Sequence, residues 1–219
     1  MYALNRAQAL LEQIYALNVP LAIEDFLVTD RRLANALDDS PAARDCDEKL
    51  LLLEDADGLC MSLFIDEALL ERLAQDDPTD CLNEHNLADF CIALEGVSHF
   101  MYVAHRAGQD RPVTLLELEL QAEVDKYVGV QTTLNSQGTC GAPHRLLRRM
   151  FEQVSFDRTL DDDARSRYRG ANAYARRYCR HLERQFVGRS PVRFVSEVRH
   201  FHALAQLEKL RHIDTNAML

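Results

Sequence analysis

The chain has 219 residues, of which 47% are hydrophobic and 27% charged, and its formal net charge is -10. This balance is typical of a globular protein, and it excludes an intrinsically disordered chain, a collagen-like repeat and a small disulfide-stapled scaffold. A chain of this length can bury enough surface to fold without a structural metal or disulfides, as one domain or two small ones.

The beginning of the chain is expected to alternate short helices and strands. Apolar residues at helical spacing predict a helix at 3–17. Residues 21–28 are predicted as a strand, because five of the eight are large and apolar. Thr29 is expected to cap a short helix that ends at Leu37.

The clearest strand signal is a β-hairpin at about 49–65. Two apolar runs flank the turn sequence Asp55-Ala-Asp-Gly58, and Gly58 can supply the positive φ that such a turn needs. Asp66 is expected to cap a helix that ends at about Gln75.

The rest of the chain is predicted to be helical. Residues 86–106 are apolar on nearly every face, so this helix should be buried and central. Thr114 and Glu117 form a capping box that opens a helix at 115–128, and residues 129–144 are expected to be a loop or linker. Further helices are expected at about 145–156, 160–187 and 192–212.

These elements predict an α+β fold that is predominantly α-helical. An acidic α/β region at residues 1–80, with the hairpin as its small β region, leads into a C-terminal helical bundle at 81–219. We expect the two regions to pack together as one domain.

The cysteines and the termini indicate a cytoplasmic protein. The six cysteines follow no zinc or disulfide spacing, and Cys60 and Cys91 lie in apolar runs, so we expect reduced cysteines in the core. No signal peptide and no stretch of 18 uncharged apolar residues is visible, so no membrane partner is expected. Cys140 and His144 in the 129–144 loop form a weak candidate for a thiol nucleophile.

A stripe of polar side chains runs along the apolar helix at 86–106. Its members recur at spacings of three and four, so they share one face. Gly96 lies mid-helix, where glycine costs about 1 kcal/mol relative to alanine, and it can allow a close approach by backbone or ligand. The stripe consists of Glu95, Ser98, His99, Tyr102 and Arg106.

The next helix carries a second acidic stripe, with Glu119 and Glu123 one turn apart. If the two helices are adjacent, these carboxylates can join Glu95 and His99. Three carboxylates and an imidazole would suit a hard or borderline divalent metal ion, which is the cofactor that this hypothesis names.

Such a site would make the chain a metal-dependent enzyme. Glu95 or Glu119 would be a ligand or general base, His99 a ligand, and Tyr102 or Arg106 would steady an anionic substrate. The alternative is a structural polar network, in which Glu95 bonds His99 and the other side chains satisfy the rest.

A second group of possible metal ligands lies near the C-terminus. Glu197 and His200 have the i, i+3 spacing found in ferritin-like carboxylate proteins, whereas Glu208 and His212 are i, i+4. A di-iron site needs two pairs with the first spacing, so an exposed basic helix face is favoured for His200 and His202.

The charge is divided unevenly along the chain. Residues 1–100 contain 21 acidic and 6 basic residues, whereas residues 145–211 contain 8 acidic and 16 basic residues. Basic side chains interleaved with aromatic ones can hold phosphates and stack bases, whereas a solvated or internally neutralised face is the alternative. The candidate anion-binding residues are Arg165, Arg169, Tyr174, Arg176, Tyr178, Arg180 and Arg184.

No nucleotide-binding loop, zincin or α/β-hydrolase signature is present in the sequence. The leading hypothesis is therefore a cytoplasmic, non-catalytic binding or regulatory protein whose Arg/Tyr-rich helix contacts an anionic protein or nucleic acid. The metal-dependent enzyme is the alternative, and a homo-oligomer is compatible with both.

Overall fold

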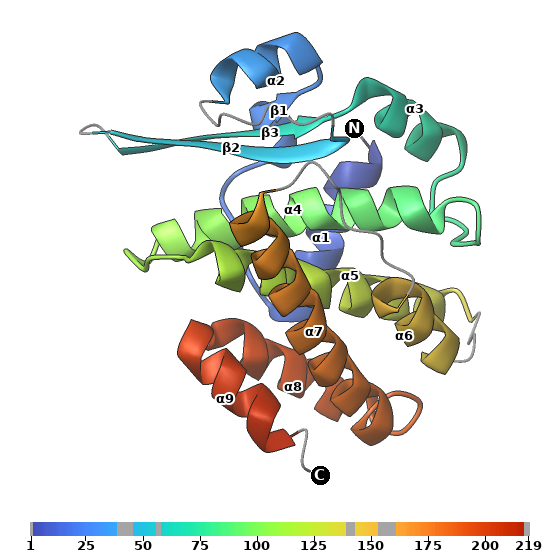
Figure 1. Cartoon of the computed structure of the whole chain (residues 1–219). Coiled ribbons are helices and arrows are strands. Elements are labelled where there is room, and N and C mark those ends of the chain that lie inside the picture. Colours follow the sequence, from blue (N-terminus) through green and yellow to red (C-terminus); the bar gives the residue numbers. More distant parts are fainter. Residues whose placement is uncertain (1, 39–45, 56–57, 139–142, 153–160, 217–219) are drawn as a thin grey trace. The chain divides into compact units, whose positions relative to one another are not determined.

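The structure is a computed structural model that describes residues 2–38, 46–55, 58–138, 143–152 and 161–216. This described part is predominantly helical with a small mixed sheet, which confirms the expected α+β class (Figure 1). The chain divides into two compact units, residues 1–10 with 18–112 and residues 11–17 with 113–219. This boundary differs from the expected division at residue 80, because the helix at 87–107 belongs with the sheet.

The first unit contains a three-stranded sheet and its covering helices. β3 lies in the centre, parallel to β1 and antiparallel to β2. In chain order the elements are α1 (Tyr2–Tyr15, whose last residues belong to the second unit), the 3-10 helix η1 (Ile23–Phe26), β1 (Leu27–Val28), α2 (Arg31–Leu37), β2 (Glu48–Asp55), β3 (Gly58–Ile65), α3 (Glu67–Gln75) and α4 (Leu87–Ala107).

The sheet is covered on both faces within this unit. Ala34 of α2 packs on Leu51 and Phe64, and α4 lies against the opposite face (Figure 1). The alternation along β2 and β3 therefore supplies apolar side chains to two cores. This arrangement places α4 where strand side chains can reach it.

The predicted hairpin is confirmed. Asp55 pairs with Gly58, whose φ is +133°, and the ladder continues to the pair Glu48 and Ile65. The Asp66 side chain accepts from the Ala68 amide and opens α3, as expected.

The predicted strand at 21–28 is wrong over most of its length. Residues 23–26 form η1, and the Gln8 side chain holds this segment by donating to the Leu21 carbonyl and accepting from the Ile23 amide. Only Leu27 and Val28 pair as a strand. The helix that follows is capped by the Asp30 side chain rather than by Thr29.

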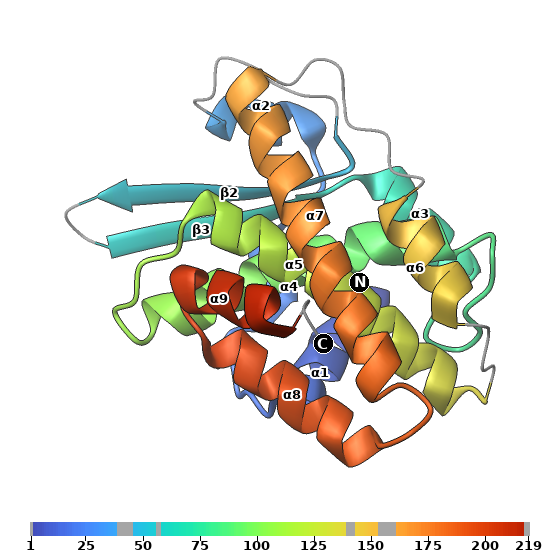
Figure 2. The same cartoon turned by 60° about the horizontal axis from the view of Figure 1, so that its bottom comes forward.

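The second unit is helical in its described residues, and α7 packs on α5, α6 and α9 (Figure 2). It also includes the last turn of α1. Its own helices are α5 (Leu115–Ser136), α6 (Pro143–Phe151), α7 (Asp162–Gln185), α8 (Pro191–Ala203) and α9 (Gln206–Asn216).

Three helix boundaries here differ from the prediction. The helix predicted at 145–156 is α6, which ends at Phe151, and residues 153–156 lie outside the described residues. The Thr114 side chain accepts from the Glu117 amide and starts α5 as expected, but the helix continues past Val128 to Ser136. Residues 129–136 of the predicted 129–144 loop are therefore helix, because packing outweighs the low helix propensity of the glycine and β-branched residues there, and residues 139–142 lie outside the described residues. The predicted helix at 192–212 is two helices, since Leu204 is extended and the Glu208 side chain accepts from the Ala205 amide to begin α9.

A buried polar chain joins three helices of this unit. Lys209 donates from Nζ to Gln121, and Gln121 Nε2 donates to Asp125 Oδ1 at 2.7 Å. The Tyr15 hydroxyl donates to the same carboxylate. Lys209 has no solvent exposure, and its ammonium lies 4.8 Å from the centre of the Phe201 ring. Hydrogen bonding of this kind is what allows polar groups to be buried.

The cysteines are less uniformly buried than expected. Cys60 is exposed at the far end of the hairpin and Cys91 is half-buried, whereas Cys179 lies in the core. Burial raises the pKa of the Cys179 thiol well above its ordinary value, so this thiol is unreactive. The Cys140 and His144 side chains lie outside the described residues.

Candidate metal centre

Helix α4 is the buried central helix that the sequence predicts. Apolar side chains cover most of its surface, including Phe90, Leu94 and Phe100. The length and composition of α4 would also suit a membrane span, but 67% of its most apolar window is buried inside the structure. Burial of this kind is typical of the core helix of a folded domain.

Gly96 brings the sheet unusually close to α4. A Cβ atom at this position would lie 2.8 Å from Cγ of Glu48, 3.0 Å from Cδ1 of Ile65 and 3.2 Å from Cδ1 of Leu63. The glycine that the sequence marks as a point of close approach thus faces side chains of β2 and β3. It leaves room for a carboxylate of the sheet beside the polar stripe.

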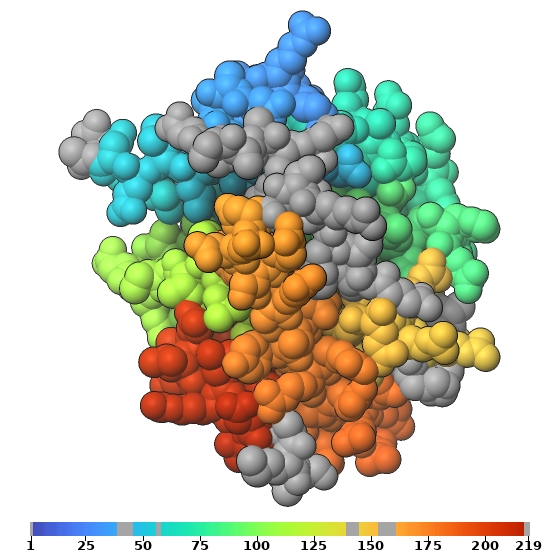
Figure 3. Space-filling model, viewed as in Figure 1, coloured from blue at the N-terminus to red at the C-terminus, as the bar shows by residue number. Residues whose placement is uncertain are grey.

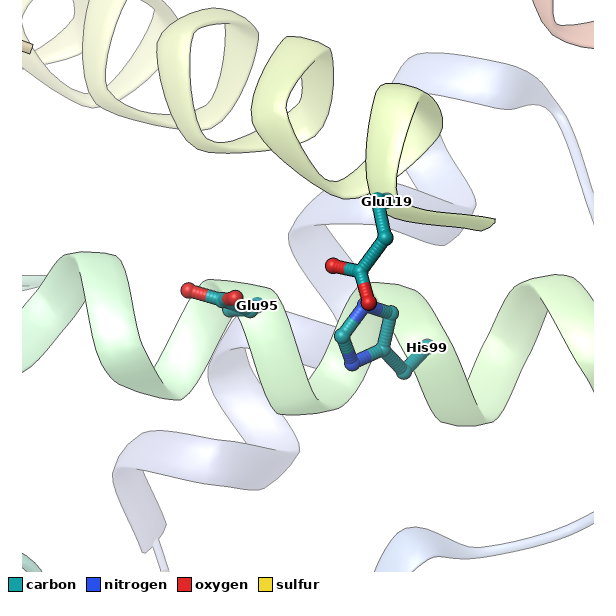
Figure 4. A group of neighbouring side chains, drawn as sticks. All are labelled: Glu95, His99 and Glu119. Carbon is teal, nitrogen blue, oxygen red and sulfur yellow. The ribbon is translucent and has the colours of Figure 1, made fainter. Parts of the chain in front are cut away.

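The carboxylate that uses this room is Glu48. Its Oε1 lies 3.2 Å from Nδ1 of His99, and both side chains are about nine-tenths buried. With Glu48 ionised and His99 neutral, Nδ1 would carry the imidazole proton, because a carboxylate can only accept, and Nε2 would be left as a ligand atom. Glu95 is one turn away on the same helix (Figure 4).

Sequence reasoning misses Glu48 entirely. It lies 51 residues before His99 and begins an apolar strand, so no helical spacing connects the two. The sequence contains only two indirect signals for Glu48, namely a charged residue at the start of an apolar strand and the glycine at position 96 of the helix. Glu48 is therefore a partner of His99 that the expected network of Glu95 and His99 does not include.

Tyr102 and Arg106 bond to each other. Nη2 of Arg106 donates to the Tyr102 hydroxyl at 2.6 Å, and the guanidinium carbon lies 4.9 Å from the ring centre. Both residues are buried. The expectation that either one steadies an anionic substrate stays a prediction.

The predicted ligands on α5 belong to the second unit. Glu119 is buried, and Glu123 accepts from Lys126 at 2.9 Å in an i, i+3 ion pair. The four predicted ligands are thus divided equally between the units, with Glu95 and His99 in the first.

The Arg/Tyr-rich helix is α7, and one of its predicted contact residues is not on the surface. Tyr178 is 1% exposed, and its ring stacks on Phe201 with the centres 3.9 Å apart. This corrects the expectation that Tyr178 stacks on a base of a partner. The ring fills the core because Ala171, Ala175 and Cys179 share its buried face.

Several arginines of α7 pair with carboxylates of their own unit. Arg176 donates to Glu152, and Arg180 lies 3.9 Å from the same carboxylate. Arg165 pairs with Asp162 at 3.1 Å. Part of the basic face is therefore neutralised locally, while Arg169 and Arg184 are exposed. The face of α7 in Figure 3 shows this outer surface.

The C-terminal Glu/His residues form a separate cluster. Oε1 of Glu197 lies 2.6 Å from Nε2 of His212, and the rings of His212 and His200 are 5.3 Å apart. Burial alone would raise the pKa of Glu197, but the His212 hydrogen bond and charge outweigh it and hold the pKa below its ordinary value. His202 is buried against Tyr15 rather than exposed, with ring centres 4.3 Å apart.

Comparison with models of known protein families, with curated proteins and with solved structures gives no match to this chain. The function therefore has to be argued from the residues themselves.

Proposed function

We propose that this chain is a metal-dependent protein that holds a divalent cation with Glu95 and His99 on α4. The main support is the hydrogen bond between His99 Nδ1 and Glu48, which favours the tautomer in which Nε2 can act as a ligand atom. Metal-binding histidines commonly donate their other ring nitrogen to a carboxylate in this way. The i, i+4 spacing of Glu95 and His99 puts the second ligand on the same helix face.

The donor types favour a borderline ion. A carboxylate oxygen and an imidazole nitrogen suit Fe²⁺, Mn²⁺ or Zn²⁺ better than Ca²⁺, which takes oxygen ligands. Glu119 and Glu123 are the further ligands that the sequence predicts. A cation held with an open position polarises a substrate oxygen or activates a water, which is the chemistry that a metal would supply here.

Elemental analysis of protein purified without added metal or chelator is the direct test. We expect Fe, Mn or Zn near one equivalent, and a rise in Tm on loading because the ion binds the native state. His99→Ala and Glu95→Gln should lose the metal. His105→Ala, on the same helix and bonded to Gln109, is the matched control and should keep it. A folded His99→Ala protein that retains its metal would refute the proposal.

A second function is favoured by the basic outer surface of the second unit. Arg145 and Arg148 of α6 are exposed, as are Arg169 and Arg184 of α7, and the two helices pack together. We propose that this surface binds an anionic protein or nucleic acid, which is the function that the charge distribution predicts. Long-range attraction of this kind weakens as salt screens it.

Charge reversal tests this second function. Replacing Arg145, Arg148, Arg169 and Arg184 by Glu should abolish binding to a single-stranded oligonucleotide or a polyglutamate peptide at low salt. The control is reversal of Arg32 and Arg111, two exposed arginines of the first unit. Binding that survives the quadruple reversal would exclude this surface. Chelator should leave this binding unchanged, which separates it from the metal centre.

A further inference from the structure

We propose that Glu48 is the positioning residue of the α4 centre and that Gly96 is what admits it. Glu48 fixes the tautomer and orientation of the His99 ring, and it does so from the sheet rather than from the helix that carries the ligands. This inference rests on the proposed function, because it assigns the residue that prepares His99 for the metal.

The Glu48 backbone is held by the pairing of β2 with β3. It pairs with Ile65 at the end of the hairpin ladder, and the next backbone bond in line joins the Asp66 amide to the Asp47 carbonyl at 2.9 Å. The carboxylate therefore projects from a rigid element. A ligand held by a partner on a rigid element keeps its geometry better than one held by a loop.

Gly96 is the reason that Glu48 reaches His99. The two α4 residues are three apart and so lie on the same side of the helix. A methyl group at position 96 would come within 2.8 Å of Cγ of Glu48, which is closer than real side chains approach. Glycine at position 96 lowers the stability of the helix, but it leaves the space in which the Glu48 side chain lies against α4 and contacts the His99 imidazole.

Neighbouring charges in the strand are directed elsewhere. Lys49 points to the opposite face of the sheet, where its Nζ donates to Asp38 at 2.6 Å. Glu54, at the other end of β2, is exposed. Glu48 is thus the carboxylate of β2 that the structure places against α4, and Glu54 is its natural control.

The test combines the tautomer of His99 with its metal affinity, both measured on the full chain. In the metal-free protein, ¹⁵N NMR of the imidazole should show the proton on Nδ1. Zn²⁺ is then titrated, and Co²⁺ absorption reports the ligand geometry. Glu48→Ala should lose the fixed tautomer, weaken Zn²⁺ binding about 10–100-fold and alter the Co²⁺ spectrum.

Two further variants and a control separate the orienting role of Glu48 from its charge. Glu48→Gln keeps an acceptor for the Nδ1 proton, so it should retain the tautomer and lose less affinity than Glu48→Ala. Gly96→Ala should displace the Glu48 side chain, so the folded variant should show the same Co²⁺ spectrum as Glu48→Ala. Glu54→Ala should match the wild type in every measurement.

The possible results are distinct. Wild-type protein that binds metal while Glu48→Ala binds it equally well, with the Nδ1 tautomer unchanged, would overturn this inference and leave the metal centre intact. Wild-type protein that binds no metal would overturn both. A fixed tautomer and tight binding that are lost together in Glu48→Ala would establish Glu48 as the positioning residue.

Discussion

Helices α4 and α7 both carry polar side chains at spacings of three and four, yet the two helices use them in opposite ways. On α4 the stripe is buried, and His99 is paired with a strand carboxylate of the same unit. On α7 the arginines point outward, and those with carboxylate partners find them at the surface. Spacing therefore determines which side chains share a face, whereas the neighbouring elements determine whether that face is a site or a solvated surface.

The difference follows from what each helix places against its neighbours. The buried face of α7 is built from small residues such as Ala171 and Ala175, which allow close packing on α5, so long charged side chains remain outside. Helix α4 is covered on most sides, so burial of its polar groups is favoured by partners within the protein, as Glu48 is for His99. A buried polar group is thus a stronger indication of a site than an exposed charge run.

The largest expected effect comes from a buried polar group of the second unit. Asp125→Ala removes the acceptor for Tyr15 and Gln121. Burial, followed by the Asp125 charge, raises the pKa of Tyr15 well above its ordinary value, so its hydroxyl stays protonated and would be left buried without this partner. At about 1–3 kcal/mol for each donor, the free energy of unfolding should fall by about 3 kcal/mol or more.

Urea denaturation measures this loss. Asp162→Ala is the surface control, because the Asp162 side chain is 99% exposed and pairs only across one turn with Arg165. It should change stability by less than about 0.5 kcal/mol. Equal effects at Asp125 and Asp162 would contradict the contrast between buried and surface polar groups.

The next effect compares the two mid-helix glycines. Gly96→Ala should destabilise the protein by about 1–3 kcal/mol, because the added methyl group overlaps Glu48 and Ile65. Gly170→Ala on α7 should instead stabilise by up to about 1 kcal/mol, since its Cβ would meet only Cδ1 of Leu116, at an ordinary 3.8 Å. Thermal unfolding of the two variants should shift in opposite directions. A stabilised Gly96→Ala protein would mean that α4 and the sheet do not approach as described.

These glycines also show how far the sequence could predict the structure. Gly96 stands out because it interrupts an apolar helix, and the structure shows a close approach there by strand side chains rather than by backbone or a ligand. Its partner is Glu48, however, and only the packing of β2 on α4 reveals it. The buried α4, the hairpin and the cap at Thr114 depend on local patterns and are predicted correctly.

The wrong predictions have identifiable physical causes. Residues 129–136 contain a glycine and β-branched residues that favour a loop, but burial of Gly129 and Val130 keeps them helical. The 3-10 conformation of η1 is stabilised by the Gln8 side chain, which is distant in sequence. The break between α8 and α9 at Leu204 is stabilised by the Glu208 side chain, which caps α9 just beyond the break. The Gln8 contact and the burial of Gly129 and Val130 are tertiary and are not visible in a single sequence, whereas the Glu208 cap is a local signal three residues from Ala205 that the prediction missed.

A smaller effect is expected from the half-buried pair of Glu197 and His212. The folded-state pKa of Glu197 lies below its ordinary value of 4.5, so its contribution to stability is present above pH 4.5 and is lost as the pH falls through the folded value. Glu197→Gln should lower the Tm at pH 7 by a few degrees, on the order of 1 kcal/mol. The difference from wild type should shrink as the pH falls below 4.5 and vanish below the folded-state pKa. A difference that persists there would show that Glu197 acts through packing rather than through its charge.

The smallest effect on stability, and the sharpest contrast with α4, is expected at Glu152. This exposed carboxylate faces both Arg176 and Arg180, so Glu152→Gln should cost less than about 1 kcal/mol. It should nevertheless strengthen binding of an anionic oligonucleotide, because two guanidinium groups of α7 lose their internal counter-charge. The variant should then elute from heparin at higher salt than the wild type.

Asp214→Asn, which removes the carboxylate partner of Arg177, should likewise raise the salt concentration of elution. If neither variant shifts the elution, the arginines of α7 are a solvated face, and the α4 centre is left as the functional part of the chain.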